Sequence, residues 1–159
     1  PIKNYEILID AVRMLKDSGV NFSVTIIGEP ALAEDRIYAE KIKNKIRNAG
    51  LENNFNFMGK VTHQNLPRQY QFHDVFVHLS KTGSLDKTLL EAMSCGMIVL
   101  SSNDAAKGFL PEALLFSSDD ARDLASKLLE SDNVDFDTRR YVAEHHDLKK
   151  LIAKISSLL

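Results

Sequence analysis

Short apolar runs rich in β-branched residues alternate along this chain with segments whose apolar residues recur at helical spacing. The apolar runs predict strands at 22–28, 54–59, 75–80, 97–101 and 113–117. The segments of helical spacing predict helices at 4–18, 34–48, 62–74, 88–95 and 119–130, and two further polar-faced helices from residue 137 onward. Strands that alternate with helices form βαβ units, so we expect an α/β fold in which a parallel sheet is covered by helices on both faces.

Single residues give more local expectations. Asn4 is expected to cap the first helix and Gly19 to end it. In the segment 34–48, Ile37, Ile42 and Ile46 are expected to face the core.

The size and composition suit one domain spanning residues 1–159. The net charge of -2 provides no bulk basic field, so nucleic acid is not an expected partner. A single cysteine excludes an internal disulfide and a cysteine zinc cluster, and together with the lack of a signal peptide it favours the cytoplasm. The sequence opens without methionine at "PIKNYEILIDAV" and enters a helical pattern at once, which we interpret as a fragment of a longer protein.

Ligands of such sheets bind at the carboxyl ends of the strands, and the stretch "KTGSLDKTLLEAMSCG" at 81–96 follows one of these ends. The first amides of the helix that it opens carry partial positive charge and suit a phosphate. Lys87 adds a full charge, and Glu91 lies one turn further, within reach of a ribose. The alternative is an ordinary loop, in which Ser84 or Asp86 is an N-cap and Glu91 is solvated.

Three other positions lie at the same predicted edge of the sheet. Gly28 ends a strand, Gly59 lies where a planar group could approach the main chain, and Lys3 could reach a phosphate. Each is also compatible with a plain loop or surface residue. The histidines lack the spacing of metal ligands, and Cys95 is expected in the core, so no metal is predicted.

Taken in order, the motifs "PIKNYEILIDAV", "FSVTIIGEP", "NFMGKV", "VFVHLS", "SLDKTLLEAMSCGMIVLSS" and "DARDLASKLLE" resemble one family across nearly all of the chain. This family is the retaining, nucleotide-sugar-dependent glycosyltransferases of the GT-B fold, and the nearest group is glycosyltransferase family 4. The resemblance implies a Rossmann-like three-layer sandwich that forms the C-terminal, donor-binding half of the enzyme. A separate N-terminal domain, which we expect upstream of residue 1, would bind the acceptor.

The resemblance also implies roles for single residues. Lys3 matches the lysine that contacts the donor diphosphate, and Glu91 matches the glutamate that binds the ribose. The turn 59–61 matches the backbone that reads the base, and the amides of Thr88 and Leu89 match the pyrophosphate contact. The implied donor-binding set is Gly28, Glu29, Gly59, Lys60, Val61, Gly83, Ser84, Lys87, Thr88 and Leu89, with Lys3, Glu91 and Asp86 nearest the chemistry.

One position departs from the family pattern. Gly83 stands where the family has the glutamate that holds the donor sugar, and "SLD" replaces Gly-Phe-Gly after it. Our hypothesis is that Asp86 or Lys87 takes over part of this contact.

The implied function is transfer of a hexose from a nucleoside diphosphate sugar to a glycan or glycolipid acceptor, without metal or cofactor, and the fragment alone is expected to be inactive. Two alternatives remain, a GT-B nucleotide-sugar epimerase and a non-catalytic nucleotide-sugar-binding module. The basic pairs at 139–140 and 149–150 suggest peripheral contact with the inner face of a membrane, although solvated helices explain them as well.

Overall fold

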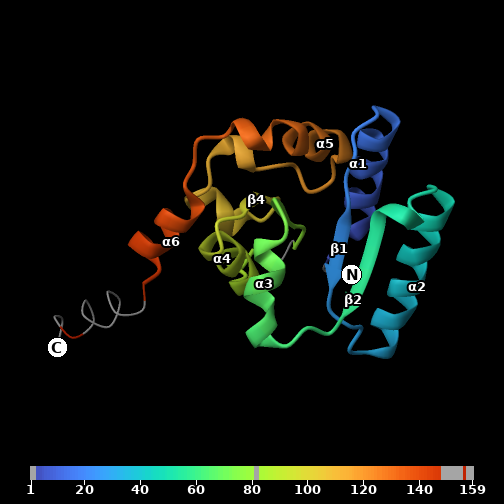
Figure 1. Ribbon diagram of the computed structural model, residues 1–159, viewed down its shortest axis with the longest axis horizontal. Coiled ribbons are helices and arrows are strands. Elements are labelled where there is room, and N and C mark those ends of the chain that lie inside the picture. The colour runs from blue at the N-terminus through green and yellow to red at the C-terminus, as the bar shows by residue number, and fades with distance from the viewer. Residues whose placement is uncertain (1–2, 81–82, 148–155, 157–159) are drawn as a thin grey trace.

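The computed structural model describes residues 3–80, 83–147 and 156. In chain order its helices and strands are α1 (Tyr5–Asp17), β1 (Val24–Ile27), α2 (Ala33–Asn48), β2 (Phe55–Gly59), α3 (Leu66–Gln71), β3 (Val75–His78), α4 (Lys87–Ser94), β4 (Ile98–Ser101), α5 (Ala121–Glu130) and α6 (Thr138–His145) (Figure 1). The predicted α/β class is confirmed. The second helix expected after residue 137 lies outside the described residues.

The strands form two parallel pairs. β1 pairs with β2 from Val24 opposite Phe55 onward, and β3 pairs with β4 from Val75 opposite Ile98 to His78 opposite Ser101. Among the described residues β1 and β3 do not pair, and a cavity lies between them. Each of these two strands therefore has an unused edge at the centre of the fold.

The strand predicted at 113–117 is much shorter in the structure. Its first part is a 3₁₀ turn, η4 (Glu112–Leu114), and only Leu115 forms a parallel bridge with Ser101. The Phe116 amide then donates to the Ser101 carbonyl at 3.1 Å. The segment thus follows β4 at one point only, because the turn uses the residues that would have extended the ladder.

The helices divide into two groups, as expected for a sheet covered on both faces. α1 packs against α2 and α5, whereas α4 packs against α3 and α6 (Figure 1). The largest fully buried apolar side chains come from α1, α2, α4, β4 and α5 and from the loops beside them: Ile9, Ile42, Leu51, Leu89, Met93, Leu100, Leu114, Leu124 and Val99. One core therefore links both strand pairs.

The local expectations have different outcomes. Asn4 is the N-cap residue of α1 by position, but its side chain makes no capping hydrogen bond, and its Nδ2 donates to the Ser118 carbonyl at 2.8 Å. The expected core position of Ile37 is wrong: its side chain on α2 is 75% exposed, since the apolar face of this helix narrows to Ile42 and Ile46. Gly19 does end α1, with a left-handed φ of 80°.

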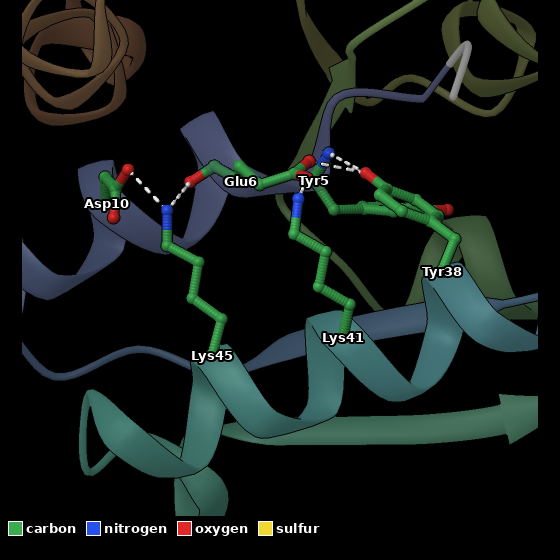
Figure 2. A network of polar contacts seen from close by, with 6 residues as sticks. All are labelled: Tyr5, Glu6, Asp10, Tyr38, Lys41 and Lys45. Atoms are coloured by element: carbon green, nitrogen blue, oxygen red, sulfur yellow. Dashed lines mark hydrogen bonds and ion pairs between the residues drawn. The ribbon is translucent and has the colours of Figure 1, made fainter.

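A polar network holds α2 against α1 (Figure 2). The Tyr38 hydroxyl donates to the Glu6 carboxylate at 2.5 Å and accepts from the Tyr5 amide at 3.1 Å. Lys41 pairs with Glu6 at 3.0 Å, and a second lysine, Lys45, reaches the Asp10 carboxylate at 2.6 Å. The network fixes the start of α1, which is the end that carries Lys3.

Candidate functional site

The loop before α4 ends in a capped helix start. Gly83 adopts a left-handed φ of 69°, and three residues later Asp86 Oδ1 accepts a hydrogen bond from the Thr88 amide at 3.2 Å. Asp86 is therefore the N-cap, and Ser84 is not. The Ser84 carbonyl instead accepts from Nδ2 of Asn103 at 3.1 Å, which ties the loop to the segment after β4.

The amides expected to face an anion are already paired. The Thr88 amide is taken by the Asp86 side chain, and the Leu89 amide donates to the Asp86 carbonyl at 3.2 Å. Partial burial raises the pKa of the Asp86 carboxyl, but the hydrogen bond from Thr88 and the neighbouring His78 imidazole outweigh it, so that the pKa is lowered. An anion that binds at this helix start must displace the Asp86 carboxylate from Thr88.

Glu91 is held by a tyrosine that the sequence analysis did not single out. The Tyr70 hydroxyl of α3 donates to Glu91 Oε2 at 3.1 Å, and its side chain is buried. Burial first, and then the Glu91 carboxylate, raise the pKa of the Tyr70 hydroxyl. Because Tyr70 reads as an ordinary core aromatic, only the packing of α3 against α4 reveals this contact.

A buried polar network lies beneath the same loop. His78 is 4% exposed at the end of β3, and its Nδ1 is 3.0 Å from Oγ of Ser101 on β4. The Ser101 hydroxyl also accepts from the Asn103 amide at 3.1 Å. On the other ring edge, His78 Nε2 stands 3.5 Å from Asp86 Oδ2 and has no hydrogen-bond partner among the described residues.

These contacts bring a serine, a histidine and an aspartate together, which the sequence analysis did not foresee. Ser101 is completely buried, so its hydroxyl orients the imidazole and cannot act as a nucleophile toward a ligand. The side chains of Ser101 and His78 meet because β3 and β4 place these two residues opposite one another.

The turns after β1 and β2 are joined. The Gly28 amide donates to the Gly59 carbonyl at 2.8 Å, and the Lys60 amide approaches Oε1 of Glu29 at 3.4 Å. Gly59 has a φ of 66°, and a Cβ at this position would lie 3.3 Å from the Glu29 carboxylate. A side chain at residue 59 would therefore strain the turn and crowd Glu29.

Many of these polar residues line one cavity of about 750 Å³. It lies between β1 and β3 along the length of both strands, with α1 along one wall, and includes residues at the carboxyl ends of the strands. The predicted site residues that line it are Lys3, Gly28, Lys60, Val61, Asp86 and Thr88, and the cavity adds Tyr70 and His78 to them. Lys3 lies close enough to contribute to lowering the pKa of the His78 imidazole, although burial is the larger cause.

The remaining predicted residues surround this cavity without lining it. Glu29 and Gly59 belong to the joined turns, Ser84 and Gly83 to the loop before α4, and Lys87 to the first turn of that helix. Glu91 stands behind Tyr70, and Leu89 is fully buried in the core. The residues thus come from the predicted loops, but they differ in access to the cavity.

Within residues 3–80 and 83–147, no three His, Cys, Asp or Glu side chains gather in a way that could hold a metal ion. The helices of this same part of the chain include none that is long and apolar enough to cross a membrane. Cys95 caps the carboxyl end of α4, and burial raises the pKa of its thiol, in agreement with a structural role.

Comparison with known proteins gives a family and a fold. Residues 1–114 match the family model described as "Glycosyl transferases group 1". Among curated proteins, mannosylfructose-phosphate synthase of Agrobacterium fabrum (strain C58 / ATCC 33970) is 28% identical over 96 residues, which cover 59% of this chain and 21% of that protein.

Two solved structures are similar over essentially the whole chain. Alr3699/HepE of Anabaena, in complex with UDP, superposes with a TM-score of 0.84 at 21% identity and covers 100% of this chain and 46% of its own. Sucrose-phosphate synthase of Thermosynechococcus elongatus superposes with a TM-score of 0.83 at 20% identity and covers 99% of this chain and 41% of its own. The chain therefore has the fold of one part of these proteins and spans less than half of their length.

Proposed function

The chain belongs to the glycosyl transferases group 1 family, and from this premise we propose that it is the donor-binding half of a retaining glycosyltransferase with the GT-B fold. The full enzyme transfers a hexose from a nucleoside diphosphate sugar to an acceptor hydroxyl. The observation that carries the proposal is that predicted site residues from the segment before α1 and from the loops after β1, β2 and β3 line one cavity together, at the carboxyl ends of the strands.

Residues that line the cavity and residues that surround it bind different parts of the donor. The diphosphate lies at the start of α4, where the helix amides, Lys3 and Lys87 are positive. The turn at Gly59–Val61 reads the base through its backbone. Glu91, held by Tyr70, binds the ribose, and Asp86 contacts the hexose in place of the glutamate that Gly83 replaces.

Catalysis follows from the charge of the leaving group. As the diphosphate departs, the sugar gains oxocarbenium character, and the negative charge that accumulates on the phosphates is stabilised by the helix amides and by Lys3. The positive charge of Lys3 and the partial positive charge of the amides take the place of a metal ion, so the proposed reaction requires none. Closure of a second domain over the cavity excludes water and aligns the acceptor.

The second domain belongs to polypeptide outside these 159 residues. Two features support a longer protein: the chain spans less than half of its solved relatives, and β1 and β3 present unused strand edges to the cavity between them. A further parallel strand would pair with both edges and fill the space between them, and the predicted site residues would then lie around its carboxyl end. The acceptor is a glycan or a glycolipid, and the protein acts in the cytoplasm, at the membrane when the acceptor is lipid-linked.

Calorimetric titration of the 159-residue chain tests the assignment. UDP and GDP are the first probes, followed by UDP-glucose and UDP-N-acetylglucosamine, because Alr3699/HepE is solved with UDP. We expect binding of one of the two nucleotides, and Glu91→Gln is expected to weaken it by about tenfold through loss of the charged acceptor for the ribose. Glu34→Gln, an exposed acid at the start of α2, is the matched control and leaves the affinity unchanged.

The result that overturns the donor-domain assignment is the absence of heat with every nucleotide and nucleotide sugar. A chain that binds UDP but transfers no sugar even when joined to the rest of its protein would instead be a non-catalytic module. The feature that raises this alternative is Gly83, which stands at the position of the family glutamate that holds the sugar. Product analysis of the full protein separates transfer from epimerisation.

A further inference from the structure

The start of α4 carries a negative charge where the proposed function places a diphosphate. Asp86 Oδ1 accepts from the Thr88 amide at 3.2 Å, which is one of the amides that the phosphate would use. The side chain of Asp86 is 41% exposed, and Asp86 lines the cavity. Two anions at one helix start repel one another, and the carboxylate needs another partner when the donor arrives.

His78 offers that partner. Its ring is 4% exposed, and Nε2 has no hydrogen-bond partner among the described residues although it lines the cavity. The other nitrogen, Nδ1, is 3.0 Å from the Ser101 hydroxyl. A buried polar atom without a partner is costly to the fold, and a contact that forms on ligand binding would remove that cost.

The tautomer of His78 follows from its neighbours. The Asp86 carboxylate can only accept, so the ring proton belongs on Nε2, the atom that faces Asp86 Oδ2 at 3.5 Å. Nδ1 then accepts from the Ser101 hydroxyl, whose oxygen also accepts from the Asn103 amide at 3.1 Å. An N–H group that stands just beyond hydrogen-bond distance of a carboxylate is arranged to receive it.

We propose that His78 is a positioning residue that receives the Asp86 carboxylate when the donor diphosphate binds, and that this movement frees the Thr88 amide for the phosphate. The proposal rests on the proposed function. In the free protein Asp86 caps α4; in the donor complex the phosphate caps the helix, and Asp86 forms a short, charge-assisted hydrogen bond with Nε2 of His78. The second carboxylate oxygen then remains at the cavity, beside the sugar.

A double-mutant cycle on UDP affinity tests the coupling. His78→Leu removes the receiving N–H, so Asp86 has no alternative partner, and UDP binding is expected to weaken by about tenfold, within the usual range of coupling between sites. In an Asp86→Ala background there is no carboxylate to move, and His78→Leu is then expected to leave the UDP affinity within about twofold. UDP carries no sugar, so the loss of a sugar contact does not enter the comparison.

His78→Gln is the conservative variant, because its amide can still donate toward Asp86. It is expected to retain most of the affinity that His78→Leu loses, whereas a role in core packing alone would make both variants equally weak. The thermal midpoint of each variant is measured first. Where His78→Leu does not fold, the comparison is made between His78→Gln and wild type with the spectroscopic readout below.

Nitrogen-15 NMR of wild-type protein follows the movement directly. On addition of UDP, the Nε2–H resonance of His78 and the Thr88 amide resonance are expected to shift together, since one loses and the other gains the Asp86 carboxylate. The inference is overturned when UDP binds and the imidazole resonances stay in place, or when His78→Leu weakens UDP equally in both backgrounds. No binding of any nucleotide to the wild type overturns the proposed function as well.

Discussion

The two strand pairs of this domain use polar side chains in opposite ways. Beside β1 and β2, the polar contacts lie between α1 and α2 near the surface, where Glu6, Tyr38 and Lys41 keep access to water (Figure 2). Beside β3 and β4, the polar side chains of Ser101 and His78 lie at the sheet itself and are at most 4% exposed. The first arrangement joins two helices, whereas the second supports a loop over a cavity.

The difference bears on the proposed binding site. Surface charges gain little from pairing because water screens them, and they also lose little when the pair breaks. Buried polar groups must be paired, and in the β3–β4 half one atom, His78 Nε2, is not. An unpaired atom in an otherwise satisfied buried network points to the half of the domain whose contacts change on binding.

The largest effect is expected at Asn103, which is 2% exposed. Its Nδ2 donates to the Ser84 carbonyl and its Oδ1 accepts from the Ala105 amide at 2.8 Å, so Asn103→Ala removes two buried hydrogen bonds. We expect a loss of about 1–3 kcal/mol in the free energy of unfolding, measured by urea denaturation. Asn103→Asp keeps the acceptor and loses the donor, so its free energy of unfolding should lie between those of wild type and Asn103→Ala. Equal stability of all three proteins would contradict the comparison.

The pH dependence of stability comes next in size. Burial lowers the pKa of the His78 imidazole, with Lys3 acting in the same direction and Asp86 opposing both. The unfolded chain therefore binds the proton more readily, and stability is fully present above the unfolded pKa of about 6.5 and falls as the pH drops below it. The slope that one such group contributes is at most about 1.4 kcal/mol per pH unit.

This slope is measured as the difference between denaturation curves of wild type and His78→Gln at several pH values, so that the other histidines cancel. The difference should be constant above pH 7 and change below about pH 6.5. A difference that stays constant down to pH 5 would mean that His78 titrates alike in both states.

Tyr38 tests the opposite half. Tyr38→Phe removes the hydroxyl that links the Glu6 carboxylate to the Tyr5 amide and keeps the ring stacked on Tyr5. The expected loss is about 1 kcal/mol in the free energy of unfolding, the typical value of a hydrogen bond, without change in UDP affinity. A variant that weakened UDP tenfold at unchanged stability would show that the α1–α2 contact also shapes the site through Lys3.

The sequence predicted regular elements better than the contacts between them. Periodicity located α1, α2 and α5, and β-branched runs located β1 and β3, because these signals are local. The pairing of strands is not local, and the segment 113–117 reads as a strand although its residues form a turn and one bridge. Ile37 was wrongly predicted to face the core for a related reason. The spacing of apolar residues along a helix does not say how much of its apolar face packs against another element.

The sequence predicted which loops line the candidate site but not which side chains contact one another there. The loops that carry Lys3, Lys60 and Asp86 do open on one cavity, because the carboxyl ends of parallel strands share an edge. Neither Tyr70 nor His78 was foreseen as a partner of the site carboxylates. Both depend on which face of α3 or β3 a side chain takes and on what the neighbouring strand places opposite it.

The smallest effect is expected at Lys41. Its side chain is 67% exposed, and its partner Glu6 keeps the hydrogen bond from Tyr38 when the lysine is removed. Lys41→Met should therefore change the free energy of unfolding by only about 0.5 kcal/mol, and 1 M NaCl should abolish the difference. Lys43→Met is the matched control, because the ion pair of Lys43 with Glu40 lies within α2 and does not reach α1. A loss above about 1 kcal/mol that persists in high salt would show that charge, and not the Tyr38 hydroxyl and the packed core, holds α2 against α1. The surface half of the domain would then resemble the buried half, and the contrast between the two strand pairs would have to be abandoned.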